Sequence, residues 1–318
     1  MRNSRELLIT GSTGFLGSAL LKKLPQSKLL GRSCPVNFQE TVKNQFIKRE
    51  IAANVDYSGC FEGVDTVIHC AARVHVMNEK SSDPLQAFRE VNVNGTLNLA
   101  EQAAEAGVQR FIFISSIKVN GESTSHDYTF TSDVQPSPED PYGVSKYEAE
   151  QGLIKLCKET GMELVIIRPT LVYGVGVKGN FLNLLKLCKS ALPLPFGAIH
   201  NARSMVYLGN LVDLIITCID HPKAIGKVFL ASDGDDFSLT RLLGLIRKSM
   251  GKPARLLPIP PVLFALLGKV TGKTAVVDRL VGNLQVDSSD AKELLDWQAP
   301  YTVEQGVKDT VDGFMKSE

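Results

Sequence analysis

The sequence has no excess of charge of either sign. Its 318 residues include 35 Lys and Arg against 34 Asp and Glu, and they form no long block of like charge. Proteins that bind a polyanion usually present a basic face, and nothing in this charge pattern resembles one. We therefore expect no nucleic-acid partner.

Cysteines are few and scattered, and none forms a C-x-x-C pair. Without such spacing the sequence indicates neither a disulfide framework nor a metal site. The opening residues "MRNSRE" lead straight into an expected strand rather than into the apolar region of a signal peptide. We expect a reduced, cytoplasmic protein with no metal. The six cysteines are Cys34, Cys60, Cys70, Cys157, Cys188 and Cys218.

Long hydrophobic runs are also missing. The most apolar stretch outside the expected strands, "PPVLFALLGKV" at residues 260–270, is too short and too interrupted to cross a bilayer. We expect no membrane span, while docking to a membrane-bound system stays open.

The sequence does contain short β-branched runs that alternate with helical patterns. The runs are "ELLIT", "KLLG", "VDTVIHCAA", "RFIFISS" and "MELVIIRP". This alternation predicts an α/β fold with a parallel sheet and helices on both faces, formed by residues 1–168. Residues 169–318 are richer in proline and less regular. They predict a smaller domain over the carboxyl edge of the sheet, with some segments returning to the sheet.

Two helices have clear boundary signals. The first is expected from about Gly14 to Leu24, directly after the first strand. The second is a long helix that Asp83 can cap, with Pro84 at its first position and Gly107 as its stop.

The stretch "LLITGSTGFLG" places three glycines where the first strand must turn into a helix. They are Gly11, Gly14 and Gly17, and their lack of a Cβ lets the backbone turn sharply and approach a ligand closely. Free N–H groups at the helix start favour a phosphate. An ordinary strand-to-helix turn is the alternative, but dinucleotides bind at the first strand of such folds.

A tyrosine and a lysine lie four residues apart in "PYGVSKYEAE". Tyr142 and Lys146 therefore share one face of a helix, where the ammonium can favour the phenolate. The pair alone could be an exposed helix face. The preceding strand, however, ends in Ser115 and Ser116 at the sheet edge where ligands bind. Either serine could bond a reacting oxygen, or merely cap the loop.

Together these motifs resemble the extended short-chain dehydrogenases/reductases, in the group of nucleotide-sugar epimerases and dehydratases that includes UDP-galactose 4-epimerase. The resemblance runs nearly end to end. It rests on "TGSTGFLG", "HCAA" at 69–72, "NVNGT" at 92–96, Ser116 five residues before Gly121, and the Tyr142/Lys146 pair. It implies a doubly wound Rossmann sheet, a bound NAD or NADP, a nucleotide-sugar substrate and a homodimer.

The resemblance also implies a role for each matching residue. Tyr142 would be the acid/base at the sugar hydroxyl, Lys146 would hold the nicotinamide ribose and lower the tyrosine pKa, and Ser116 would bond the reacting oxygen. Asn180 and Arg203 would meet the substrate diphosphate, although a helix cap and a solvated loop charge are the alternatives. The residues implied to line the cofactor are Gly11, Gly14, Phe15, Leu16, Gly17, Cys70, Ala71 and Ala72.

Three positions depart from the family pattern. Ser116 is followed by Ile117 and Lys118 rather than by an acidic pair, which argues against a 4,6-dehydratase. Asn120 stands where the family often has tyrosine, and the sequence offers no account of it. The end of the second strand, "KLLGRS", has no acid for an NAD ribose but has Arg32 for a 2′-phosphate, which favours NADP. Arg32 could equally be solvated or stack on adenine.

The sequence leaves more than one function open. The first is oxidoreductase chemistry at C4 of a nucleotide-diphosphate sugar, either a UDP-sugar 4-epimerase or a 4-keto-sugar reductase. An epimerase usually resembles an NAD enzyme, so the NADP-like "GRS" favours reduction, whereas overall similarity favours the epimerases. A non-catalytic sensor of NADP(H) and a reductase of a non-sugar ketone are the alternatives.

Overall fold

Seven parallel strands form one sheet in the order β3-β2-β1-β4-β5-β6-β9. The computed structural model describes residues 6–35, 45–74, 83–190, 192–272 and 274–317 of the chain. This strand order is that of a doubly wound Rossmann sheet, which confirms the predicted fold class. The strands are β1 Leu7–Thr10, β2 Lys28–Gly31, β3 Phe46–Lys48, β4 Thr66–His69, β5 Arg110–Ile114, β6 Glu163–Pro169 and β9 Lys227–Ala231.

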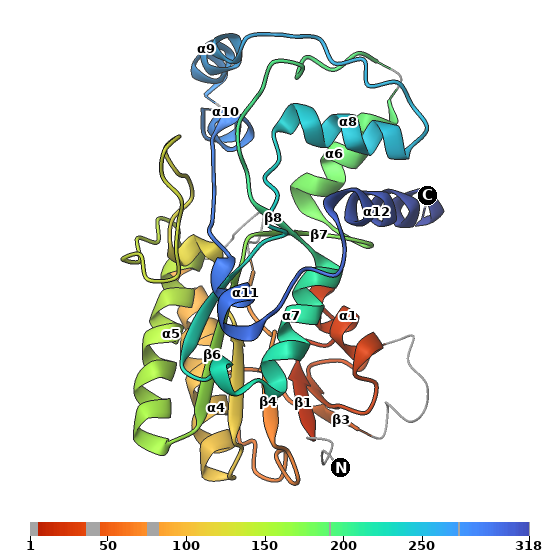
Figure 1. The fold of residues 1–318 in the computed structure, drawn as a ribbon. Helices are drawn as coiled ribbons and strands as arrows, with labels where there is room; N and C mark the ends of the chain where they lie inside the picture. Colours follow the sequence, from red (N-terminus) through yellow and green to blue (C-terminus); the bar gives the residue numbers. More distant parts are fainter. Residues whose placement is uncertain (1–5, 36–44, 75–82, 191, 273, 318) are drawn as a thin grey trace.

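Helices cover both faces of the sheet (Figure 1). On one face lie α4 (Thr96–Glu105) and α5 (Pro141–Thr160). On the other lie α1 (Phe15–Lys23), α7 (Leu208–Asp220) and α11 (Ser289–Leu295). Successive strand residues point to opposite faces, and both faces are buried, which explains why the strands read as continuous apolar runs.

The long helix expected after Asp83 is divided. It begins as predicted, because the Asp83 side chain accepts from the Gln86 N–H at 3.1 Å and Pro84 opens α3 (Pro84–Arg89). A π-helical segment, Glu90–Gly95, then separates α3 from α4. The wider turn is accompanied by a close approach, since a Cβ on Gly95 would lie 2.8 Å from the Ala52 nitrogen.

The remaining helices gather beyond the carboxyl edge of the sheet (Figure 1). They enclose a separate apolar core together with a small parallel ribbon. We call this part the cap. Its elements are β7 Leu171–Tyr173, α6 Gly179–Lys189, β8 Met205–Tyr207, α8 Leu239–Ser249, α9 Pro261–Thr271, α10 Thr274–Val281 and α12 Val303–Ser317.

Residues 282–286 link the cap to the Rossmann part. Their backbone bridges Arg203 on the cap side and both Thr124 and Phe130 in the loop that follows β5. A small cluster of buried side chains, which includes Ile117, Phe130 and Leu284, fills the space beneath. No helix within the described ranges is long and apolar enough to span a bilayer.

Candidate active site

The glycine loop between β1 and α1 is packed so tightly that two of its positions exclude any side chain. Gly11 has a φ of +70°, and a Cβ there would lie 2.7 Å from the Ala71 nitrogen. A Cβ on Gly17 would lie 2.2 Å from the Gly11 carbonyl oxygen. The Gly14 N–H donates to that same carbonyl at 2.9 Å. The spacing of the three glycines is therefore required by the turn itself.

The residues of this loop fit a dinucleotide pyrophosphate. Helix α1 starts at Gly14 with no side-chain cap and with no acidic residue in its first turn, so its first N–H groups are open to an anion. The Phe15 and Leu16 side chains pack into apolar cores, so only their backbone N–H groups would face a phosphate. Ser12 Oγ is buried and, within the described part of the chain, has no hydrogen-bond partner.

His69, at the end of β4, fixes the strand end beside the glycine loop. Its ring lies 2.8 Å from Thr10 Oγ1 through Nδ1 and 3.0 Å from Thr96 Oγ1 through Nε2. Thr10 Oγ1 also accepts from the Ala71 N–H at 3.1 Å, so this hydroxyl joins the histidine to the residues that follow β4. Burial, followed by the Lys146 charge, lowers the pKa of His69 to about 3.

The predicted tyrosine and lysine lie at the start of α5. Asp140 caps the helix by accepting from the Gly143 N–H at 2.7 Å, which places Tyr142 in the first turn. Lys146 follows one turn later and is 2% exposed. Its Nζ donates to the Ile114 carbonyl at 2.8 Å and lies 4.4 Å from the centre of the Phe113 ring. The ammonium is thus fixed at the end of β5.

Burial dominates the titration of both groups. It lowers the pKa of Lys146 to about 8, against the raising effects of Cys70 and Glu150, so the amine is mostly charged at neutral pH. Burial raises the pKa of Tyr142, and the Asp140 charge acts in the same direction. Lys146 is not among the causes of this shift, so the lowered tyrosine pKa that the resemblance implies stays a prediction for the protein with its cofactor bound.

The two serines after β5 have different surroundings. Ser115 Oγ is buried and donates to Glu150 Oε1 at 2.5 Å. Ser116 is half-buried and opens the 3₁₀ segment Ile117–Val119, where its Oγ accepts from the Lys118 N–H at 3.3 Å. Ser115 is committed to the interior, which leaves Ser116 as the candidate for a substrate oxygen.

A buried ion pair lies directly behind these groups. Glu150 accepts from Arg168 Nε at 3.0 Å and from Nη2 at 2.6 Å, and both side chains are almost fully buried. Arg168 Nη1 also donates to Asn120 Oδ1 at 2.9 Å. This contact gives the physical reason for Asn120, which the sequence left without an account.

Sequence reasoning missed this ion pair, although both members carried a signal. Glu150 lies one turn after Lys146 on the same helix face, and Arg168 ends the apolar run "LVIIR". A charge at the end of a buried strand requires a partner.

Lys118 occupies the place of the family's acidic pair. Its Nζ pairs with Asp140 and with Glu122, the latter at 2.8 Å. The lysine thus ties the loop after β5 to the capping residue of α5. A lysine with a structural role therefore occupies the position at which a dehydratase would present a carboxyl group.

The other residues predicted to line the site lie on separate elements around Tyr142 and Lys146. Cys70, Ala71 and Ala72 follow β4, and burial raises the pKa of Cys70 to about 12, so it is a thiol. Arg32 is exposed at the end of β2.

Two further predicted residues lie in the cap. Asn180 is exposed in the first turn of α6, and it is not the cap of that helix, because Lys178 holds the cap position. Arg203 precedes β8, and its Nη1 donates to the Gly282 carbonyl at 3.1 Å.

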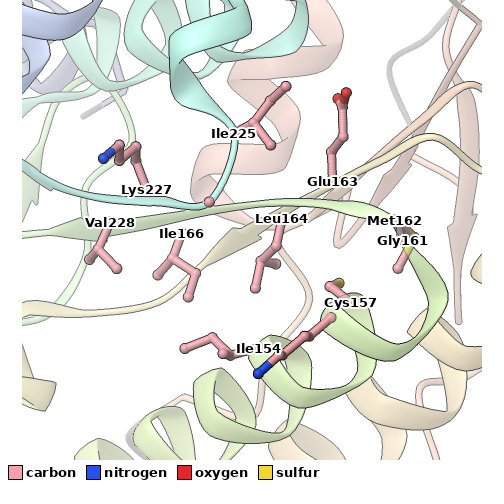
Figure 2. Close-up of a pocket in the computed structure, with 12 residues that line it drawn as sticks. Ile154, Cys157, Gly161, Met162, Glu163, Leu164, Ile166, Ile225, Lys227 and Val228 are labelled. Carbon is pink, nitrogen blue, oxygen red and sulfur yellow. The ribbon is translucent and has the colours of Figure 1, made fainter.

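An apolar pocket of about 280 Å³ lies at the opposite end of the strands (Figure 2). It is lined by the last turns of α5 and by the first residues of β6 and β9, including Ile154, Leu164 and Val228. Its place at the amino ends of the strands separates it from the catalytic groups. We assign it no part in the chemistry.

Comparisons with known proteins identify the family. The model of the NAD dependent epimerase/dehydratase family matches residues 7–231. The chain belongs to this family. A UDP-glucose 4-epimerase of Vibrio cholerae is 48% identical to this family member, over 98% of the chain and 96% of the relative.

A second relative is named for a sugar that a diphosphate joins to a polyprenol. It is the N-acetyl-alpha-D-glucosaminyl-diphospho-ditrans,octacis-undecaprenol 4-epimerase of Escherichia coli O157:H7, which is 29% identical over 96% of the chain and 94% of the relative.

Solved structures of similar fold support the architecture. A UDP-glucuronic acid 4-epimerase from Bacillus cereus in complex with NAD has a TM-score of 0.76 at 22% identity, covering 98% of this chain and 99% of its own. A UDP-glucose 4-epimerase from Thermotoga maritima with UDP-glucose has the same TM-score at 23% identity and the same coverage. At this identity the likeness establishes the fold of this epimerase/dehydratase family member.

The neutral His69 predicts a pH-dependent loss of stability. The folded protein leaves this ring unprotonated down to about pH 3, whereas the unfolded chain binds a proton below about pH 6.5. The His69 contribution to the free energy of unfolding should therefore be complete above pH 6.5 and fall by about 2 kcal/mol between pH 6.5 and pH 5.

Urea unfolding of the parent and of His69→Gln at pH 7, 6 and 5 measures this contribution. The variant should be less stable at pH 7, and its deficit should shrink as the pH falls, since glutamine does not titrate. A deficit that stays constant over this range would show that the pKa of His69 is the same in the folded and the unfolded protein.

Proposed function

We propose that the chain is a 4-epimerase of a UDP-sugar. The observation that carries this proposal is the arrangement on α5 and β5, with Tyr142 one helical turn before a buried Lys146 whose Nζ is fixed on the end of β5, the strand that leads to Ser116. The Vibrio cholerae relative at 48% identity supports the same reaction. The family membership makes a nicotinamide dinucleotide the cofactor, and the glycine loop fits it.

Each residue of the site has a proton or a contact to provide. The bound nicotinamide would supply the acceptor and the donor of the C4 hydride. Tyr142, as a phenolate in the protein with its cofactor bound, would take the proton of the C4 hydroxyl as that carbon is oxidised, and the resulting phenol would return it as the keto group is reduced from the other face of the sugar. Lys146 would stabilise the phenolate before and after this exchange, because its cation lies within the same buried region. Ser116 would hold the C4 oxygen throughout.

Removing the phenol should stop the reaction without removing the cofactor. We expect Tyr142→Phe to lower the rate of epimerisation of UDP-glucose by about 10²- to 10⁴-fold, the usual loss for a general acid/base. Tyr147→Phe, which changes the residue directly after Lys146 on α5, is the matched control and should retain activity. Near-normal turnover of Tyr142→Phe would remove this residue from the mechanism.

The choice between NAD and NADP depends on Arg32. The absence of an acid in "KLLGRS" and the exposed guanidinium at the end of β2 support NADP, whereas the similar structures hold NAD. We propose Arg32 as the contact for the 2′-phosphate of NADP, as its place at the end of the second strand suits that group.

Binding measurements distinguish the two cofactors. NADPH should bind more tightly than NADH, and Arg32→Ala should weaken NADPH binding by about tenfold or more while leaving NADH unchanged, through loss of one charge-assisted contact. Lys23→Ala, which removes an exposed cation from α1, is the control. Equal affinities of the parent for both cofactors would make the NADP proposal wrong.

The diphosphate of the substrate would meet Arg203 and Asn180. The guanidinium of Arg203 is a planar fork, which suits two phosphate oxygens at once. Asn180 is exposed in the first turn of α6, where open N–H groups favour an anion.

UDP alone should therefore bind and raise the thermal midpoint of the cofactor-loaded protein. Arg203→Ala should lose most of this increase and Arg203→Lys should recover part of it, while the affinity for the dinucleotide stays the same in both. If neither UDP nor dTDP shifts the midpoint while a simple ketone is reduced, the substrate is not a nucleotide sugar.

A second candidate substrate is a sugar whose diphosphate is joined to a polyprenol. The Escherichia coli relative is named for such a substrate. The observation that favours it is the exposed apolar surface of the cap, since Leu266 and Val270 of α9 are 60% and 78% exposed. Epimerisation of a short-chain prenyl-diphosphate sugar, with UDP-sugars inactive, would select this candidate.

The homodimer and the cytoplasmic location implied by the sequence stay predictions. Sedimentation of the purified chain would measure the first of them.

A further inference from the structure

Most apolar side chains of helix α9 are exposed to solvent. The helix lies at the far end of the cap, away from the sheet (Figure 1). Gly268 is the only buried residue of the helix, all of whose positions are described. The five most exposed apolar side chains are Val262 at 70%, Leu263 at 51%, Leu266 at 60%, Leu267 at 59% and Val270 at 78%.

These five side chains form one continuous face. At about 100° per residue they fall within a sector of about 140°, a width typical of the apolar face of an amphipathic helix. The opposite side of α9 makes the contacts with the protein. Phe264 stacks on Phe196 with ring centres 5.4 Å apart, and Gly268 lies against Val277 of α10. The exposed face is therefore not the one that attaches the helix to the cap.

The chain around α9 carries charge of one sign only. No Asp or Glu occurs between Asp236 and Asp278, although the whole chain is nearly neutral. Lys269 on α9 and Lys248 at the end of α8 are both exposed. The seven basic residues of this stretch are Arg241, Arg247, Lys248, Lys252, Arg255, Lys269 and Lys273, of which Lys273 lies outside the described residues, Arg247 is buried and Arg241 pairs with Asp235 and Glu304.

We propose that α9 docks the protein on the surface of a membrane that contains anionic lipids. A convex apolar face beside a stretch of purely basic charge matches an acyl layer beneath anionic headgroups. The helix is about 16 Å long, about half the thickness of a hydrocarbon core, so it lies in the plane of the interface and does not cross it.

The charge pattern favours a bilayer over a second copy of the chain. Two copies that met through α9 would bring like charges together, whereas an anionic surface neutralises them. Leu257, in the segment that leads to α9, is a further exposed apolar side chain at 48%. Docking here is independent of the UDP-sugar epimerisation proposed above, because α9 contributes no group to the catalytic site; only the polyprenol candidate uses the same apolar surface.

Flotation with lipid vesicles tests the proposal. The full chain should float with vesicles of phosphatidylcholine and phosphatidylglycerol, and float less with phosphatidylcholine alone or at high salt. The double variant Leu266→Glu/Val270→Glu should lower the bound fraction by more than about tenfold. It removes two apolar side chains that docking would bury in the bilayer, and it adds negative charge. Met315→Glu is the matched control, as Met315 is 46% exposed on α12.

Two further measurements make the result decisive. The double variant should keep the parent's activity on a water-soluble UDP-sugar, which shows that it is folded and separates this proposal from the proposed function. Its oligomeric state in solution should also be that of the parent. Failure of the parent to float with anionic vesicles, or equal flotation of parent and double variant, would overturn the proposal. A change of oligomeric state in the double variant without an effect on flotation would assign α9 to a contact between copies.

Discussion

The buried pair of Glu150 and Arg168 is the constraint on which the catalytic centre depends. It joins α5 to the end of β6, and through Ser115 and Asn120 it also holds the loop that follows β5. Removing one member of such a pair costs about 3–5 kcal/mol, because the remaining charge stays buried without a partner. The pair therefore fixes the position of α5 along the sheet. Since Lys146 lies one turn earlier on the same helix, its reach to the Ile114 carbonyl follows from this anchoring.

The two sides of the dinucleotide cleft are built by different means. Near the glycine loop the contacts are neutral, with a histidine that burial keeps uncharged between two threonines. On the catalytic side they are ionic, with Lys118 between Glu122 and Asp140 and with Arg168 on Glu150. A neutral frame suits a region that receives a pyrophosphate at backbone N–H groups. Fixed ions suit a region where charge develops on a phenol and a sugar oxygen, because they need no rearrangement during the reaction.

Local sequence signals predicted the parts of the structure that depend on neighbours along the chain. Gly11 and Gly17 are required by one tight turn, and Asp83 with Pro84 starts α3. The π-helical segment at Glu90–Gly95 was missed because its apolar pattern is close to that of a regular helix. The bridge of residues 282–286 to Thr124 and Phe130 was also beyond the sequence, since it joins segments far apart along the chain. The contact of Arg168 with Asn120 belongs to the same class, and so the sequence could not account for the asparagine.

Strand β9 completes the sheet only after β7, α6 and β8 of the cap, and then α7, have been synthesised. Until then β6, whose run "ELVIIRP" is almost entirely buried in the folded protein, is an open sheet edge. At roughly 5–20 residues per second, a ribosome needs several seconds to deliver the chain from Pro169 to Ala231. A nascent chain in this interval exposes the kind of edge that pairs with other chains. Chaperone demand during synthesis should therefore be set by the order of elements along the chain, with the first part of the cap inserted between two neighbouring strands.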